Sequence, residues 1–174
     1  SLVVGAGFIL FQHDAKRLLA YCSVEHVGLV ALGLGLGPLG VAAALFHSLN
    51  HSLAKCLAFF SVGRLGQACG GHAITRLSGA FRLSPLWGVG LLGSFLALSG
   101  AAPAASFLSE LLILKAAFDT GAWLAFATLL GGLAVAFVGM MRHTIRLAWA
   151  PAEAPPARLH TGWLETALVV VPLA

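Results

Sequence analysis

The sequence predicts an all-α integral membrane protein, a polytopic bundle of helices. Apolar residues make up 59% of its 174 residues and charged residues make up 9%, against about 25% charged in a typical soluble domain. The mean hydropathy of +0.95 agrees with this reading. Three stretches, 27–46, 83–109 and 120–141, contain no ionisable side chain. Each is long enough to cross about 30 Å of hydrocarbon as a helix.

The apolar stretches are expected to be helices, because a backbone surrounded by lipid must satisfy its own hydrogen bonds. Glycines and Pro38 separate the second helix from the third, and residues 64–83 connect the third to the fourth. The proline-rich segment 148–161 is expected to be a surface linker. In chain order, the expected helices are 1–12, 18–36, 40–62, 84–101, 104–118, 121–147 and 162–174.

Both terminal stretches are shorter than the roughly 20 residues that a spanning helix needs. We therefore interpret residues 1–174 as a single membrane domain that forms the C-terminal fragment of a longer membrane protein, with a truncated helix at each end.

The small residues between Gly100 and Pro103 interrupt an otherwise continuous apolar run. Proline lacks the N–H that a helix needs and clashes with the preceding turn. One interpretation is a tight turn or a simple kink. The other is a discontinuous helix that exposes backbone groups to an internal water path. The residues alone favour neither. Glu110 follows Pro103 by seven residues, which is about two helical turns.

The strongest functional signal is a stripe of ionisable side chains, His47, His51 and Lys55, in the apolar segment that follows Pro38. A spacing of four residues places all three on one helix face. Facing lipid would cost roughly 3 kcal/mol or more for the lysine alone, so the stripe must face protein or water. Histidine titrates near neutral pH and suits proton transfer. The alternative is that these side chains only hold helices together.

Glu110 is the second candidate, because it follows twenty-seven residues without an ionisable side chain. Its alternative role is a carboxylate at the start of a helix, stabilised by the helix dipole. Glu25 and His26 are adjacent and cannot share one helix face, so at least one is expected to meet another helix. Both are also candidates for an ion pair or for coupling.

Three charged residues lie where the first helix meets the second. They are expected either to form an ion-pair or coupling network or to be ordinary interfacial charges: Asp14, Lys16 and Arg17.

Several classes of function are excluded. The sequence has no nucleotide-binding or hydrolase motif, and its ten basic residues form no patch for nucleic acid. His47 and His51 could bind a metal, but no third ligand is close in sequence, so neither a metal nor a cofactor is expected. A haem held between histidines of different helices is a further alternative. The three cysteines form no metal or redox pair.

Two runs of sequence carry a resemblance to a known family. They are Asp14-Ala-Lys-Arg-Leu-Leu-Ala-Tyr-Cys-Ser-Val-Glu-His-Val-Gly28 and Phe46-His-Ser-Leu-Asn-His-Ser-Leu-Ala-Lys55. They resemble the proton-conducting antiporter-like subunits of complex I, of multi-subunit sodium/proton antiporters and of membrane-bound hydrogenases. With Ser106-Phe-Leu-Ser-Glu110 and its surroundings, the sequence looks most like hydrogenase 4 component F of formate hydrogenlyase-type complexes.

The resemblance implies a fold of two inverted five-helix repeats, of which this chain would hold the second, with its discontinuous helix near Pro103. It also implies roles for individual residues. His47, His51 and Lys55 match the central proton-relay positions, Glu110 matches the titratable position of the broken helix, and residues 14–17 match a charged motif between the repeats.

The resemblance further implies a proton-translocating membrane subunit of a redox-driven complex, with no redox centre of its own. Its partners would be other membrane subunits, a peripheral redox arm and the lipid bilayer of the inner (plasma) membrane. The rival interpretation is a structural scaffold subunit of the same kind of complex without its own ion path. Dry, fully paired side chains around His47 and Lys55 would favour the scaffold.

Overall fold

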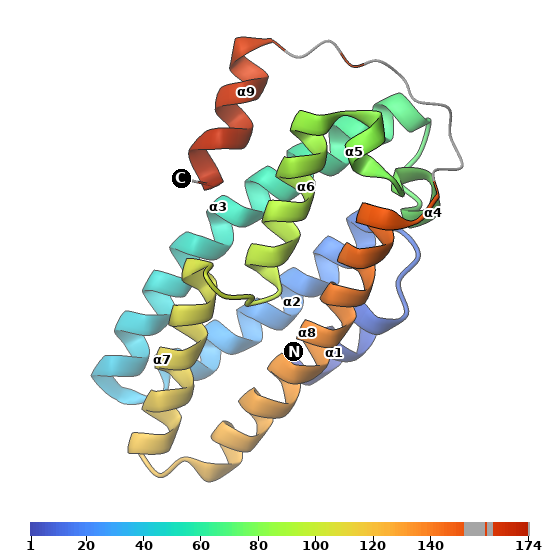
Figure 1. Ribbon diagram of the computed structural model, residues 1–174. Helices are drawn as coiled ribbons and strands as arrows, with labels where there is room; N and C mark the ends of the chain where they lie inside the picture. The colour runs from blue at the N-terminus through green and yellow to red at the C-terminus, as the bar shows by residue number, and fades with distance from the viewer. Residues whose placement is uncertain (152–158, 160–161, 174) are drawn as a thin grey trace.

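The computed structural model describes residues 1–151, 159 and 162–173 (Figure 1). The described residues form helices and contain no named strand, which confirms the predicted all-α class. In chain order the helices are α1 (Leu2–Leu10), α2 (Ala15–Leu34), α3 (Gly37–Cys69), α4 (Ile74–Leu77), α5 (Ala80–Leu83), α6 (Pro85–Leu98), α7 (Ala105–Asp119), α8 (Trp123–Trp149), α9 (Trp163–Val170) and a short 3-10 helix (Val171–Leu173).

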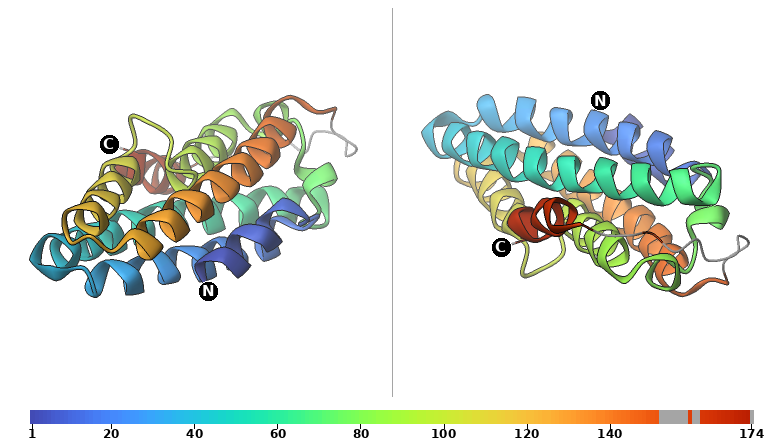
Figure 2. Two further views of the ribbon diagram at one scale, coloured as in Figure 1. Left: turned by 90° about the horizontal axis from the view of Figure 1, so that it is seen from below. Right: turned by 90° about the horizontal axis from the view of Figure 1, so that it is seen from above.

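The long helix α3 organises the bundle, because it packs against α2, α6 and α7. The helices α6 and α7 follow one another along α3, while α8 packs against α1, α6 and α7 (Figure 1). The two views in Figure 2 show α2 and α3 side by side in one layer. The C-terminal helix α9 lies against α6 at one end of the bundle.

The run from Pro85 to Asp119 is divided into two helices, with residues 99–104 between them; we call these residues the helix break. The discontinuous helix predicted near Pro103 is therefore present. Gly100, within the break, has a φ of +67°, a conformation that glycine adopts without the steric cost of a Cβ.

The third helix runs seven residues beyond the expected end at residue 62. Gly63 and Gly66 do not stop it, because a glycine inside a helix costs only about 1 kcal/mol. The helix ends at Gly70, whose φ of +67° and N–H bond to the Gly66 carbonyl form a left-handed cap. The expected connection 64–83 is shorter as a result, and it contains the single-turn helices α4 and α5.

The ends of the chain differ slightly from the expected ranges. The first helix stops at Leu10, and the last has eight residues followed by the 3-10 helix. Most of the expected linker 148–161 lies outside the described residues.

Two of the described helices, α2 and α8, are long and apolar enough to cross a membrane. The apolar helix α6 has only fourteen residues, and α7 has fifteen. Each is too short to cross about 30 Å of hydrocarbon alone, whereas their 29 helical residues together measure about 44 Å. The 33 residues of α3 measure about 50 Å, and its histidines, asparagine and lysine lower its hydropathy.

Candidate functional site

Three histidines meet between α2 and α3 and form what we call the histidine cluster: His26, His47 and His51. The ring centroids of His26 and His51 are 4.4 Å apart, and those of His26 and His47 are 5.0 Å apart. His26 and His47 are buried, and His51 is partly buried. The stripe on α3 therefore faces protein, as expected, and α2 adds a third imidazole that the spacing within α3 could not reveal.

Hydrogen bonds connect the histidine cluster to both sides of the helix break. His26 Nδ1 lies 3.0 Å from His47 Nε2, and His26 Nε2 lies 3.2 Å from the carbonyl oxygen of Leu98, the last residue of α6. His47 Nδ1 lies 2.8 Å from Ser109 Oγ on α7. The carbonyls at a helix end have no partner in their own helix, and here a histidine supplies one.

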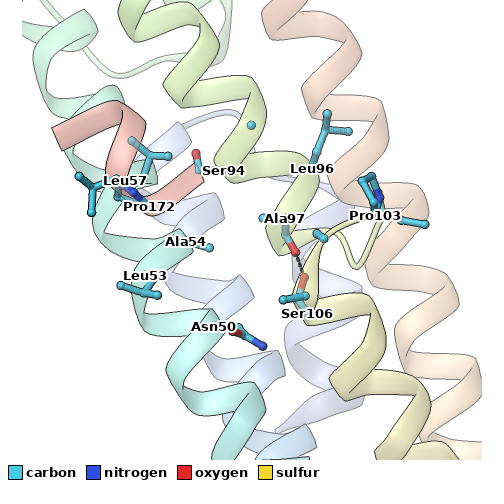
Figure 3. A pocket seen from close by; sticks show the side chains of 16 residues that line it. Asn50, Leu53, Ala54, Leu57, Ser94, Leu96, Ala97, Pro103, Ser106 and Pro172 are labelled. Atoms are coloured by element: carbon cyan, nitrogen blue, oxygen red, sulfur yellow. Dashed lines mark hydrogen bonds between the residues drawn. The ribbon is translucent and has the colours of Figure 1, made fainter. Parts of the chain in front are cut away.

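The two serines on α7 were not identified as candidates by the sequence analysis. Ser106 donates a hydrogen bond from its hydroxyl to the Ala97 carbonyl across the break (Figure 3). Ser109 donates to the Ser106 carbonyl at 2.7 Å while it contacts His47. The two serines are three residues apart and follow the break directly, so they share one helix face. This spacing is the sequence signal that could have identified them.

Lys55 continues the row of polar side chains one turn beyond His51. Its side chain is 7% exposed, and its ammonium group donates a hydrogen bond to the Leu19 carbonyl on α2. His47, His51 and Lys55 therefore all face α2 or the helix break rather than lipid.

Glu25 and His26 are both buried, although adjacent side chains point about 100° apart on a helix. Glu25 Oε2 lies 3.5 Å from His26 Nε2, and Glu25 Oε1 has no hydrogen-bond partner within the described residues. Glu25 also packs against α1, since a Cβ at Gly5 would overlap with its backbone. Both residues thus meet other helices, and a carboxylate stands beside the histidine cluster.

Glu110 lies on α7 with its carboxylate directly against Gly100 of the helix break. A Cβ at Gly100 would overlap with that carboxylate. Glu110 is buried and is the sixth residue of α7. It therefore lies beyond the first turn of the helix, and the helix dipole stabilises an acid mainly within that first turn. The alternative of a simple helix-start carboxylate does not fit this position.

Gly100→Ala is expected to destabilise the protein more than Gly121→Ala. Both glycines have a φ of +67°, and an alanine in this conformation costs about 1–2 kcal/mol. Nothing lies within 4 Å of a Cβ at Gly121, whereas one at Gly100 would displace the Glu110 carboxylate. Thermal unfolding of the two variants in detergent measures the difference. Equal melting temperatures would show that the contact between Gly100 and Glu110 has no energetic weight.

The three charged residues at the start of α2 form no ion-pair network among the described residues, so of the two alternatives ordinary interfacial charges fit Lys16 and Arg17. Asp14 is the N-cap of α2, and its carboxylate accepts hydrogen bonds at 3.0 Å from the backbone N–H groups of Lys16 and Arg17. The side chains of Lys16 and Arg17 are exposed, and no ion pair joins them to Asp14. An aspartate directly before a helix caps it more readily than it pairs with the flexible bases that follow.

A pocket of about 590 Å³ opens beside the helix break. Asn50 on α3 and Ser106 on α7 face this space, with Ser94 on α6 and Pro172 near the C-terminus around it (Figure 3). Asn50 Nδ2 is buried without a hydrogen-bond partner among the described residues, and Asn50 precedes His51 in the chain. The pocket therefore places the polar side chains of Asn50 and Ser106 beside the helix break.

Glu165 on α9 is another polar contact that the sequence did not predict. It forms an ion pair with Arg64 on α3 and accepts a hydrogen bond from the Trp87 indole on α6 at 3.3 Å. These contacts hold α9 against the end of the bundle.

Comparison with known proteins gives one family model that matches residues 1–136, described as NADH:quinone oxidoreductase/Mrp antiporter, transmembrane. The chain is 35% identical over 150 residues to a hydrogenase-4 component F homolog of Methylacidiphilum infernorum (isolate V4), covering 86% of this chain and 31% of that protein.

Two solved structures share the fold. A chain of respiratory complex I from Thermus thermophilus superposes with a TM-score of 0.82 and 32% identity, covering 99% of this chain and 39% of that one. A chain of an archaeal membrane-bound sulfane sulfur reductase gives a TM-score of 0.84 and 31% identity, covering 98% and 36%. The chain spans about a third or less of the length of the first curated relatives it matches.

Proposed function

The chain belongs to the NADH:quinone oxidoreductase/Mrp antiporter family of transmembrane proteins, and on that premise we propose that it moves protons within a membrane subunit of a redox-driven complex. The proposed relay consists of His26, His47, His51, Lys55 and Glu110. The observation that carries the proposal is the buried series of hydrogen bonds from His26 through His47 to Ser109. It links the Leu98 carbonyl before the helix break to Ser109 after it.

Imidazole groups suit this task because each ring accepts a proton on one nitrogen and releases one from the other. The 3.0 Å separation of His26 Nδ1 and His47 Nε2 is a hydrogen-bonding distance, so a proton passes between them without a large movement of either ring. The Leu98 carbonyl and the Ser109 hydroxyl hold the outer nitrogens and fix the orientation of both rings.

The scaffold alternative expects dry side chains whose polar atoms are all paired. Here three buried polar atoms near the proposed relay have no partner within the described residues: Glu25 Oε1, Asn50 Nδ2 and His51 Nδ1. Such groups are costly in a structural core and call for a role that involves water, ions or protons. The pocket beside Asn50 has the volume for several water molecules and supports an exchange route at the break.

The wider setting belongs to the same proposal. The fold places the chain in a membrane, and we assign it to the inner (plasma) membrane of its cell. Its partners would be other membrane subunits and a peripheral redox arm, since the similar structures are chains of multi-subunit respiratory complexes. The chain itself would bind no redox cofactor and would respond to redox chemistry elsewhere through changes in the coupled sites.

Ser109→Ala is the most selective test of the relay, because it removes no titratable group and only two hydrogen bonds, the one to His47 and the local one to the Ser106 carbonyl. His47 Nδ1 would lose its partner, and a hydrogen bond is worth about 1 kcal/mol. We expect the rate of proton translocation in the complete complex to fall about fivefold while the complex still assembles.

Ser78→Ala is the matched control. Ser78 is also buried, and its hydroxyl bonds only to the Ile74 carbonyl, away from the histidine cluster. Proton uptake by vesicles and electron transfer would be measured together in both variants. If the Ser109→Ala variant assembled in smaller amounts but kept a normal proton-to-electron ratio, the scaffold interpretation would be supported instead.

A further inference from the structure

The histidine cluster has the geometry of a metal site. One ligand nitrogen from each of His26, His47 and His51 can be chosen so that all three lie within 4.8 Å of one another. Zinc binds histidine nitrogen at about 2.0–2.1 Å, so two ligands of a tetrahedral site lie about 3.3 Å apart. The separation of 3.0 Å between His26 Nδ1 and His47 Nε2 is close to that value. We propose that the cluster binds a divalent transition-metal ion such as Zn²⁺.

The hydrogen bonds around the cluster leave His26 Nδ1 and His47 Nε2 free to bind a metal ion. A carbonyl oxygen only accepts, so His26 Nε2 donates to the Leu98 carbonyl, and Nδ1 of the neutral ring carries a lone pair. The Ser109 hydroxyl donates to the Ser106 carbonyl and therefore accepts from His47 Nδ1. In that arrangement His47 Nε2 also carries a lone pair.

Two lone pairs then face each other at 3.0 Å, and a cation must lie between them: either the proton that the proposed relay passes or a metal ion in its place. Metal-binding histidines characteristically donate their other ring N–H to a carbonyl, a carboxylate or a similar acceptor, which fixes the ring for coordination. Leu98 and Ser109 fill that role here.

His51 completes the set of ligands. Its ring centroid lies 4.4 Å from that of His26 and 6.1 Å from that of His47, and its Nδ1 is buried without a hydrogen-bond partner among the described residues. A buried nitrogen with no partner is available to a metal without first breaking another bond. The sequence placed His47 and His51 together but offered no third ligand, because His26 is twenty-one residues earlier in the chain.

The charges around the cluster also suit a cation. The Glu25 carboxylate lies 3.5 Å from His26 and has one oxygen atom without a partner. The ammonium group of Lys55 opposes a second cation, but it is bound to the Leu19 carbonyl, two turns away from His26 along α2. An all-imidazole set selects zinc or copper over magnesium and calcium, which prefer oxygen ligands.

A metal ion would enter beside His51, the member of the cluster that is only partly buried. Asn50, which precedes His51 in the chain, lines the pocket of about 590 Å³ at the helix break. A metal ion that binds in the cluster would occupy the two nitrogens between which the proposed relay passes its proton. The proposal that the cluster binds a metal rests on the geometry alone. The expectation that a bound metal stops proton movement also rests on the proposed function.

The test is zinc binding to the purified complete complex, treated with ZnCl₂ and freed of unbound metal. We expect wild type to retain one more zinc ion per chain than the variants His26→Phe and His51→Phe. The zinc affinity of both variants should fall at least tenfold, because the loss of even an indirect partner of a metal ligand lowers metal affinity about tenfold or more. His143→Phe is the matched control, because His143 is buried away from the cluster and bonds to the Ile9 carbonyl. Equal zinc content in all four proteins would overturn the proposal.

X-ray absorption at the zinc edge provides a second test that does not depend on the folding of any variant. The zinc retained by wild type should show histidine nitrogen at about 2.0 Å. Sulfur at about 2.3 Å would assign it to cysteine and overturn the proposal. Proton translocation is recorded separately, so that bound zinc with undiminished translocation would count against the relay and leave the metal site intact.

Discussion

Lys55→Leu is expected to abolish proton translocation by the complete complex while the complex still assembles. Lys55 is the buried cation at the end of the polar row on α3, and its ammonium group is held by a backbone carbonyl rather than by a carboxylate. No ion pair with an acid among the described residues therefore holds its proton, and in the proposed relay the group exchanges that proton with the histidine cluster. Leucine fills a similar volume but holds no proton.

Lys55→Arg separates proton exchange from charge. Arginine keeps the positive charge but does not lose its proton in proteins. If Lys55 only supplied charge or a hydrogen bond to the Leu19 carbonyl, the arginine variant would work nearly as well as wild type. If Lys55 passes protons, as we propose, the arginine variant should fail like the leucine variant.

The matched control is Lys115→Leu. Lys115 lies on α7, is exposed, and forms an ion pair with Asp119 four residues later. Its loss should leave translocation unchanged, since an exposed pair of this kind contributes at most about 1 kcal/mol. Proton uptake and electron transfer are measured in sealed vesicles. A normal proton-to-electron ratio in Lys55→Leu would rule out the proposed relay.

The sequence predicted those parts of the site that lie on one helix. The spacing of His47, His51 and Lys55 places them on one face whatever the rest of the fold does, because it follows from 3.6 residues per turn. The helix break was also predictable as one of two alternatives, since small residues and Pro103 interrupt an apolar run there.

The parts that depend on contacts between helices were not predictable. Whether Glu25 or His26 faces α3 depends on the rotation of α2 about its axis, and adjacent residues give no periodic signal for it. The contact between Ser109 and His47 joins residues sixty-two positions apart. The capping role of Asp14 was not predicted, because capping and ion pairing use the same side chain, and only the backbone geometry decides between them.

Glu110→Gln is expected to reduce proton translocation as severely as Lys55→Leu. Glutamine has the shape of glutamate and can occupy the same space against Gly100, so the helix break keeps its packing. It cannot bind and release a proton near neutral pH. A severe defect would therefore assign the function to the titrating carboxyl group and not to the volume of the side chain.

Two further variants sharpen this test. Glu110→Asp keeps the carboxyl group on a shorter side chain and should restore part of the translocation. Glu165→Gln removes a carboxylate that pairs with Arg64 on α3, away from the helix break, and it should lower the melting temperature without changing the proton-to-electron ratio. If Glu110→Gln matched wild type in that ratio, Glu110 would be a packing residue of the break, and proton exchange at this point would have to use the histidine cluster and the pocket beside Asn50.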